Sequence, residues 1–178
     1  MPSEDTVRVS VIFFDLGDTL ICEQGLNGKS LLEAELEKLP YLDEVLDELK
    51  EKGYKLGIIT NTVVSREEHV REALIRIGVE RYFDVVVTSV DVGHDKPDVR
   101  IFLEALSRIG VRPQEAIMVG NRISKDIVGG NRAGMKTVLF KWNERYPENI
   151  ASRDEMPNYI ISSLKELPTI LDEKLKQK

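Results

Sequence analysis

The chain has 178 residues and a formal net charge of −6, so it is long enough to bury a hydrophobic core and too acidic to attract nucleic acid or anionic membranes through bulk charge. Its single cysteine cannot form an internal disulfide, which suits a reducing compartment. Residues 1–10 lack a secretory apolar region, and no apolar run approaches the length of a membrane span. We therefore expect a single cytoplasmic domain over residues 1–178, with no specific nucleic-acid signal and no membrane partner.

Strand-like and helix-like segments alternate along the chain, which is typical of an α/β fold with a parallel sheet covered by helices on both faces. Runs of apolar β-formers predict strands over 7–14, 55–59, 83–88, 116–119, 136–140 and, at a sheet edge, 159–161. Amphipathic periodicity predicts helices over 30–39, 42–49, 101–109 and 164–171, one opened by a capping box at 65–68, and one beginning near 126. We expect the lysine-rich tail, 172–178, to be frayed.

The first predicted strand ends in two carboxylates around a glycine, Asp15-Leu16-Gly17-Asp18. Open α/β sheets bind ligands at the carboxyl ends of their strands, and a carboxylate at that edge needs a metal, a cation or N–H donors in place of water. Gly17 allows a tight bend, so its carbonyl could join the Asp15 oxygens around a hard cation. The simpler alternative is that Asp18 caps the next turn and Asp15 is a solvated loop residue.

Polar residues also follow three other predicted strands, namely Thr60, Asn61, Lys96, Asn121 and Asp126. Each has an ordinary structural explanation as a helix cap, a turn residue or a solvated cation. However, the carboxyl ends of parallel strands lie along one edge of a sheet, so these side chains are expected to gather near Asp15. Their order along the chain is hard to obtain by chance.

These motifs resemble those of the haloacid dehalogenase-like hydrolase superfamily. The resemblance covers about residues 9–170 and rests on four segments: 14–20, 59–61, 93–98 and 119–127. It implies a Rossmann-like, doubly wound parallel sheet with a minimal cap insertion. It also implies a Mg²⁺-dependent phosphohydrolase that acts through an aspartyl-phosphate intermediate on a phosphate ester or anhydride.

The resemblance assigns a role to each motif residue. Asp15 is implied as the nucleophile and a metal ligand, and Lys96 as the cation that neutralises developing charge and contacts the phosphoryl group. Phosphate binding is implied for Thr60 and Asn61. The implied ligands of Mg²⁺ are Asp15, the Gly17 backbone carbonyl, Asn121 and Asp126. A carboxylate nucleophile suits this chemistry because it needs no deprotonation at neutral pH.

Two positions depart from the family pattern. Gly17 stands where phosphatases of the family carry an acid/base aspartate, and the nearest carboxylate, Asp18, comes one residue later. Loss of a general acid costs about 100- to 10,000-fold in rate for poor leaving groups, and less for acyl phosphates. Asn121 replaces a metal-binding aspartate, which lowers the charge offered to Mg²⁺. A weakly active or non-catalytic phosphate- or protein-binding protein, and a metal-independent haloacid dehalogenase, therefore stay open as alternatives.

The segment 21–39 is the only place for a cap, and it has room for one short helix at most. A large helical cap does not fit, so the site is expected to be open. An open site favours a bulky or macromolecular phosphorylated substrate, or closure by another subunit of a homo-oligomer, which would also allow a small substrate. The missing cap leaves no obvious pocket for a small halo-acid.

Overall fold

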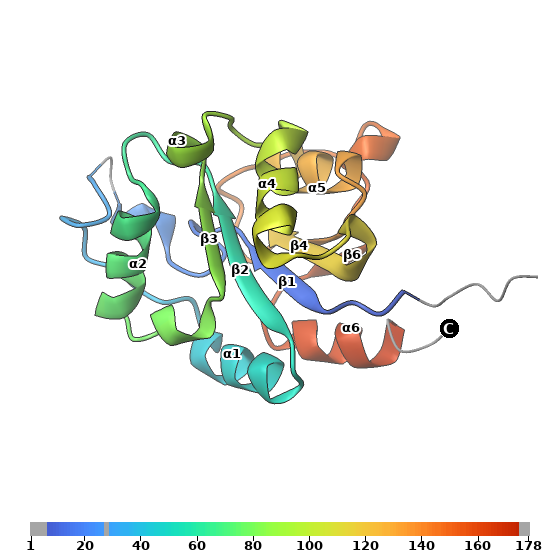
Figure 1. The fold of residues 1–178 in the computed structure, drawn as a ribbon, viewed down its shortest axis with the longest axis horizontal. Coiled ribbons are helices and arrows are strands. Elements are labelled where there is room, and N and C mark those ends of the chain that lie inside the picture. The colour runs from blue at the N-terminus through green and yellow to red at the C-terminus, as the bar shows by residue number, and fades with distance from the viewer. Residues whose placement is uncertain (1–6, 27–28, 175–178) are drawn as a thin grey trace, which may run out of the picture.

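Within residues 7–26 and 29–174, which the computed structural model describes, six parallel strands form one sheet in the order β3-β2-β1-β4-β5-β6 (Figure 1). The strands are β1 (Val11–Phe14), β2 (Lys55–Thr60), β3 (Val85–Thr88), β4 (Ala116–Gly120), β5 (Lys136–Phe140) and β6 (Tyr159–Ile161). Strand β1 lies in the middle, where Phe14 is level with Ile58 of β2 and Val119 of β4. The chain segments that follow these three strands therefore start side by side.

The six predicted strands are confirmed, although β1 is shorter than predicted. Every residue of β1, β3 and β4 is buried, as expected for near-continuous apolar runs in a sheet covered on both faces. The first strand was expected over 7–14, but regular pairing begins only at Val11. Strand β6 lies at the edge, where Ile160 is 54% exposed.

Helices cover both faces of the sheet, as predicted (Figure 1). They are α1 (Leu42–Glu51), α2 (Glu67–Arg76), α3 (Ser89–Val92), α4 (Val99–Ile109), α5 (Val128–Arg132), which follows a π-helical turn (Ile123–Ile127), and α6 (Glu166–Lys174). Short 3-10 turns occur at Glu23–Gly25, Glu80–Tyr82, Pro113–Glu115 and Arg153–Glu155. Because alternate side chains of a strand point to opposite faces, Ile12 and Phe14 share one core with α1, α2 and α6, while Val11 and Phe13 share the other with α4.

The helix predicted over 30–39 is wrong. The described residues there form turns, and Lys38 makes an isolated antiparallel bridge with Ile21. Arg76 of α2 explains the difference, because its guanidinium donates to the carbonyls of three loop residues, Leu31, Leu32 and Ala34, at 2.8–3.0 Å. These carbonyls therefore bind a neighbouring helix. Residues 27–28 of the predicted insertion lie outside the described residues.

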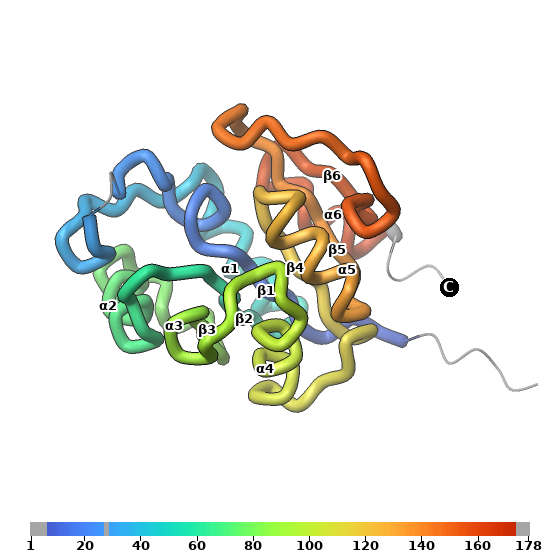
Figure 2. The backbone as a smooth tube through the Cα atoms, turned by 90° about the horizontal axis from the view of Figure 1, so that it is seen from above, coloured from blue at the N-terminus to red at the C-terminus, as the bar shows by residue number. Residues whose placement is uncertain are grey.

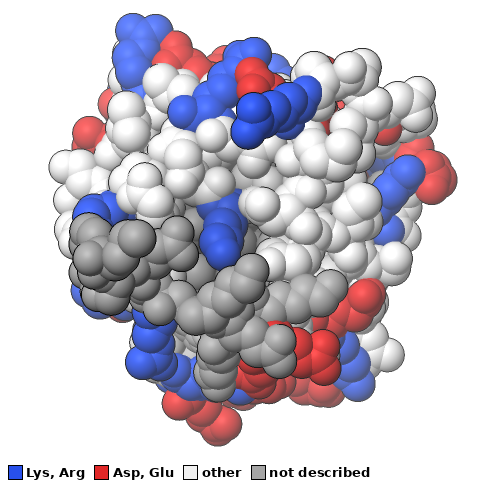
Figure 3. All heavy atoms as spheres, turned by 90° about the vertical axis from the view of Figure 1, so that its right-hand side faces the viewer, with Lys and Arg blue, Asp and Glu red and all other residues white. Residues whose placement is uncertain are grey.

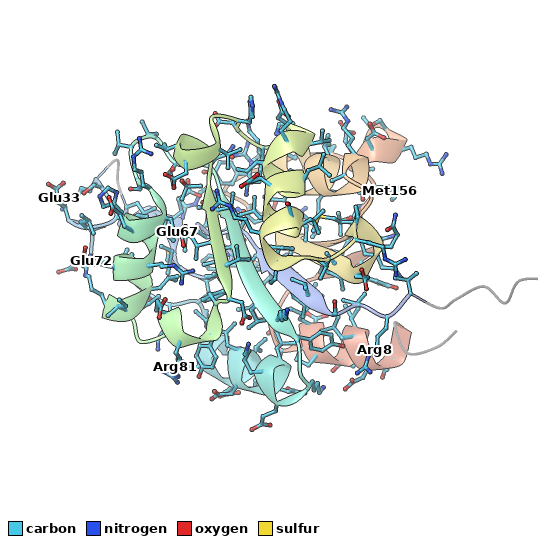
Figure 4. The ribbon with its side chains drawn as sticks, in the orientation of Figure 1. Arg8, Glu33, Glu67, Glu72, Arg81 and Met156 are labelled. Carbon is cyan, nitrogen blue, oxygen red and sulfur yellow. The ribbon has the colours of Figure 1, made fainter. Side chains whose placement is uncertain are left out.

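Figure 4 shows that this loop lies beside α2, with Glu33 of the loop and Glu72 of the helix at the same outer edge of the molecule. The segment between β1 and α1 contains no α-helix among its described residues. The expectation of a minimal cap insertion is thus met by a loop that is fastened to α2 through Arg76.

The capping box predicted at 65–68 is also wrong. Helix α2 begins at Glu67, whose backbone N–H donates to Asp91 Oδ2 at 2.7 Å. The backbone N–H of Arg66 donates to His69 Nδ1 at 3.0 Å. A carboxylate from a segment distant in the sequence, together with a histidine, therefore replaces the expected local Ser65–Glu68 exchange.

The predicted fraying of the tail is wrong for residues 172–174, which belong to α6. Lys52 at the end of α1 forms an ion pair with Asp172 at 2.5 Å, which fastens the last described turn to the body of the protein. Residues 175–178 lie outside the described residues. Of the helices in the described part, none has both the length and the apolar character that crossing a bilayer requires.

The face on the right-hand side of Figure 1 carries acidic and basic side chains interspersed around a larger uncharged area (Figure 3). On the described part of this face, charge of one sign does not extend over a continuous patch. The described part of this face therefore provides no extended electrostatic attraction for a polyanion.

The Arg76 contacts give a test of how the loop after β1 is held. Arg76→Ala should lower the free energy of unfolding by about 1 to 2 kcal/mol, because three charge-assisted hydrogen bonds are lost at a partly exposed site. Arg108→Ala is the matched control, since Arg108 forms surface ion pairs with Glu104 and Glu67 of the described chain. Its effect should stay within about 0.5 kcal/mol. Urea unfolding measures both, and equal losses would contradict the assignment.

Candidate active site

A cavity of about 860 Å³ opens at the carboxyl edge of the sheet. Figure 2 shows the loop after β1 and the segment after β5 arching on opposite sides of the central strands, and both contribute to the cavity wall. The predicted site residues that line it are Asp15, Gly17, Thr60, Asn61, Lys96, Asn121 and Asp126. The predicted residues at the ends of the strands therefore gather around one cavity, as expected, whereas Asp18 does not line it.

Lys96 lies between two carboxylates at the centre of the site. Its ammonium donates to Asp15 Oδ1 at 2.9 Å, to Asp126 Oδ1 at 2.7 Å and to the Ile59 carbonyl at 2.8 Å. The side chains of Lys96 and Asp126 are 2% and 0% exposed, whereas that of Asp15 is 13% exposed. Asp15 is thus the member of this charged cluster that a molecule in the cavity reaches most readily.

The charge of the Lys96 ammonium is compensated by the two aspartates beside it. Burial alone would lower the pKa of Lys96, but the two carboxylates outweigh burial and raise that pKa above its ordinary value. Burial raises the pKa of Asp126 to about 6, against the lowering effect of Lys96. The raised pKa keeps the Lys96 ammonium protonated at neutral pH, between Asp15 and Asp126.

Asp126 can approach β4 so closely only because residue 120 is glycine. A Cβ atom at Gly120 would lie 2.3 Å from the Asp126 carboxylate, which is too close for any side chain. The second carboxylate oxygen accepts from the Arg122 backbone N–H at 3.0 Å. The glycine-entered turn after β4 thus positions this carboxylate under the end of the strand.

Asn61 holds the backbone of Lys96. Its amide group donates to the Lys96 carbonyl at 3.1 Å, and its amide oxygen accepts from the Lys96 backbone N–H at 2.8 Å. The side chain is therefore committed to positioning the lysine, and phosphate binding by Asn61 stays a prediction for its backbone. Thr60 is buried and donates to the Asn61 carbonyl at 3.4 Å. That long contact leaves the hydroxyl able to turn toward a ligand.

The oxygen atoms at the site fit a hard divalent cation. Asn121 Oδ1 is buried and lacks a hydrogen-bond partner in the described structure, and Asn121 lines the cavity together with Asp15 and Asp126. In the described ranges, no group of three or more His, Cys, Asp or Glu side chains is placed to hold a metal. Two carboxylates and an amide oxygen, completed by water, suit Mg²⁺, which is bound by few protein ligands and retains several waters.

Asp18 does not line the cavity. Its carboxylate is fully buried, where Oδ2 accepts from Arg145 Nε at 2.6 Å and Oδ1 accepts from the Glu23 backbone N–H at 2.9 Å. Its carbonyl accepts from Trp142 Nε1 at 2.9 Å. Its φ of 52° lies in the left-handed region, which aspartate adopts more readily than most residues. Asp18 therefore joins the loops after β1 and β5 and is not brought to the cavity that Asp15 lines.

The cavity wall also contains residues that were not among the predicted site residues, and Glu23, Arg145 and Tyr146 are three of them. Tyr146 Oη donates to Glu23 Oε1 at 2.6 Å, which links the loop after β1 to the segment after β5. A signal for this segment was present, because residues 141–146 follow the end of a fifth parallel strand. Because the carboxyl ends of parallel strands lie along one edge of a sheet, these residues are expected at the same edge as the other site residues.

A sequence model of the haloacid dehalogenase-like (HAD) hydrolase family matches residues 25–140. The chain therefore belongs to this family, which confirms the resemblance that its motifs carry. The match begins after β1, so Asp15 and Gly17 lie before it.

Individual proteins agree with this assignment. The chain is 45% identical over 104 residues to a glyceraldehyde 3-phosphate phosphatase of Methanothermobacter thermautotrophicus, which covers 58% of this chain and 45% of the relative. It is 39% identical over 124 residues to the pyrophosphatase PpaX of Bacillus velezensis, covering 70% and 55% respectively. A solved HAD phosphatase from Thermococcus onnurineus is 26% identical, with a TM-score of 0.74 over 92% of this chain and 98% of that one. The chain matches about half the length of these two curated relatives.

Replacing the central lysine tests the electrostatic account of the site. Lys96→Met should lower the free energy of unfolding by about 3 kcal/mol at neutral pH, because it leaves two neighbouring carboxylates without their cation. Lys125→Met is the control, since Lys125 lines the same cavity but lies outside the ion-pair cluster. It should change stability by no more than about 0.5 kcal/mol.

The sign of the pH dependence follows from Asp126. A carboxyl group whose pKa is raised by folding favours the folded state at low pH and opposes it as the pH passes that pKa. The pKa of Asp126 is already raised to about 6, and loss of Lys96 raises it further. The deficit of Lys96→Met should therefore be larger at pH 8 than at pH 5 in urea unfolding. An equal deficit at both pH values would contradict this account.

Proposed function

We propose that this protein is a Mg²⁺-dependent phosphohydrolase that acts through an aspartyl-phosphate intermediate on Asp15. The observation that carries the proposal is the charged cluster in an open cavity, where Asp15 is partly exposed and Lys96 and Asp126 are buried behind it. Membership of the HAD hydrolase family and the similarity to named phosphatases support it. Because fold alone does not determine chemistry, the proposal depends on these residues.

The proposed reaction has two displacements at phosphorus. In the first, an Asp15 carboxylate oxygen attacks the phosphoryl group, the bond from phosphorus to the leaving oxygen breaks, and an aspartyl-phosphate forms. In the second, water attacks that phosphorus, which releases inorganic phosphate and restores the Asp15 carboxylate. Lys96 offsets the negative charge that accumulates near Asp15, and Thr60 supplies a hydroxyl donor beside it.

Asp15, Asn121 and Asp126 are the side chains proposed to hold Mg²⁺, with the Gly17 carbonyl as a further predicted oxygen. When bound there, Mg²⁺ would neutralise phosphate charge and hold the phosphate against the nucleophile. The buried Asn121 Oδ1 without a partner is the observation that favours a cation at this position.

The substrate is proposed to be a small phosphate ester or anhydride. The two relatives are named for glyceraldehyde 3-phosphate and pyrophosphate, which are both small phosphorylated molecules. The cavity of about 860 Å³ has room for a molecule of that size. It also has cationic residues at its wall, Lys29, Arg122, Lys125 and Arg145.

Asp15→Asn tests the nucleophile. The amide has the same shape but cannot form the acyl phosphate, so turnover of 4-nitrophenyl phosphate with Mg²⁺ should fall at least about 10,000-fold. Thermal unfolding should show that the folded state is retained. If wild-type protein releases no phosphate from aryl phosphates, glyceraldehyde 3-phosphate or pyrophosphate, yet binds phosphate in calorimetry, a binding function replaces this proposal.

Asn121→Asp tests the metal site. The added negative charge should lower the Mg²⁺ concentration for half-maximal activity by roughly tenfold, because Mg²⁺ affinity rises with ligand charge. Gln24→Glu is the control, since it adds the same charge at the wall of the same cavity without replacing the unpartnered amide oxygen. Activity should be lost on adding EDTA and return with Mg²⁺. Full activity in EDTA would rule out the metal dependence.

A further inference from the structure

The proposed reaction requires a proton carrier that Asp15 and Lys96 do not supply. The leaving oxygen of an alkyl phosphate departs slowly unless it receives a proton, and the attacking water must lose one in the second displacement. Asp15 is occupied as the nucleophile, and Asp126 is hydrogen bonded to Lys96 and to the Arg122 backbone. Among the described residues that line the cavity, Glu23 is the one remaining carboxyl group.

Gly17 comes two residues after the proposed nucleophile, Asp15. The Glu23 side chain occupies the space in front of Gly17. A Cβ atom at position 17 would lie 3.3 Å from Glu23 Oε2 and 3.5 Å from Glu23 Cδ. Gly17, Glu23 and Asp15 all line the same cavity. The absent side chain of Gly17 is thus replaced by a carboxyl group that arrives from the 3-10 turn Glu23–Gly25.

Glu23 is held in this position at both ends. Tyr146 Oη donates to Oε1 at 2.6 Å, which leaves Oε2 as the oxygen that faces Gly17. The Glu23 backbone N–H donates to Asp18 Oδ1 at 2.9 Å, and Arg145 holds the other oxygen of Asp18. Burial and the Glu23 carboxylate raise the pKa of Tyr146 to about 12, so Tyr146 stays a hydrogen-bond donor. The buried Asp18 carboxylate therefore serves to place Glu23.

We infer that Glu23 is the catalytic acid and base of the reaction, which rests on the phosphohydrolase proposed above. In the first displacement the Glu23 carboxylic acid gives its proton to the leaving oxygen as the bond from phosphorus to that oxygen breaks. In the second, the Glu23 carboxylate takes a proton from water as the water oxygen bonds to phosphorus and the Asp15 oxygen departs. The cycle ends with the Glu23 acid and the Asp15 carboxylate restored.

Glu23→Gln tests this role, because the amide keeps the shape and the Tyr146 contact but carries no transferable acid proton. With glycerol 3-phosphate as an alkyl ester, turnover should fall about 100- to 10,000-fold. With acetyl phosphate, whose leaving carboxylate needs no proton, the variant should still release one equivalent of acetate in a burst. It should then turn over slowly, because the water still lacks a base. Glu33→Gln, on the loop outside the cavity wall, should match wild type.

A rescue experiment separates catalysis from structural support. In a Glu23→Ala background the space in front of Gly17 is vacated, so a Gly17→Asp substitution can place a carboxyl group there. This double variant should turn over glycerol 3-phosphate at least about tenfold faster than Glu23→Ala alone. Gly17→Ala in the same background should be no faster than Glu23→Ala. Thermal unfolding of each variant verifies that the fold persists.

The outcomes distinguish this inference from the proposed function. If Glu23→Gln turned over glycerol 3-phosphate as fast as wild type, the role of Glu23 would be overturned and the proposed function would not. Equal losses of the alkyl ester reaction and of the acetate burst would have the same meaning. Retained turnover in Asp15→Asn would instead overturn the phosphohydrolase mechanism itself. A selective loss of alkyl ester turnover, with the burst preserved and Gly17→Asp rescuing, establishes both.

Discussion

The ion-pair cluster of Lys96 with Asp15 and Asp126 is the interaction on which the candidate site depends. Two carboxylates brought together at the edge of a buried sheet repel each other and lose hydration, and the ammonium between them compensates for both losses. The same ammonium also bonds to the Ile59 carbonyl at the end of β2. One side chain thereby joins the end of β1, the end of β2 and the turn after β4. The charges of the cluster are held in place by the fold itself.

Around this cluster, the polar and charged residues have unequal roles. Asn61 clamps the lysine backbone, and Asp18 supports the loops through Arg145 and Glu23, so neither side chain is open to a ligand. Asp15 and Glu23 instead face the cavity. Asp18, which is close to Asp15 in sequence, is therefore a structural anchor. Glu23, which is more distant in sequence, occupies the space in front of Gly17.

The fold and the cluster could be predicted from sequence because they depend on short-range patterns. Buried runs such as residues 11–14 define strands, and the parallel order then places Asp15, Lys96 and Asp126 at one edge. The failures share a different cause. The segment 30–39 has helical spacing, but the Arg76 guanidinium binds three of its carbonyls. At the start of α2, the Glu67 N–H donates to Asp91, which lies outside the helix. Such contacts depend on side chains from elsewhere in the chain, which local periodicity does not record.

The place of β1 in the sheet has a consequence for how the protein is assembled. The first strand lies between β2 and β4, and the lysine and the second carboxylate of the cluster come from residues far along the chain. Asp15 therefore has both cluster partners only in the assembled sheet, because Lys96 follows β3 and Asp126 follows β4. An intact cluster therefore reports a complete central sheet rather than any local segment of the chain.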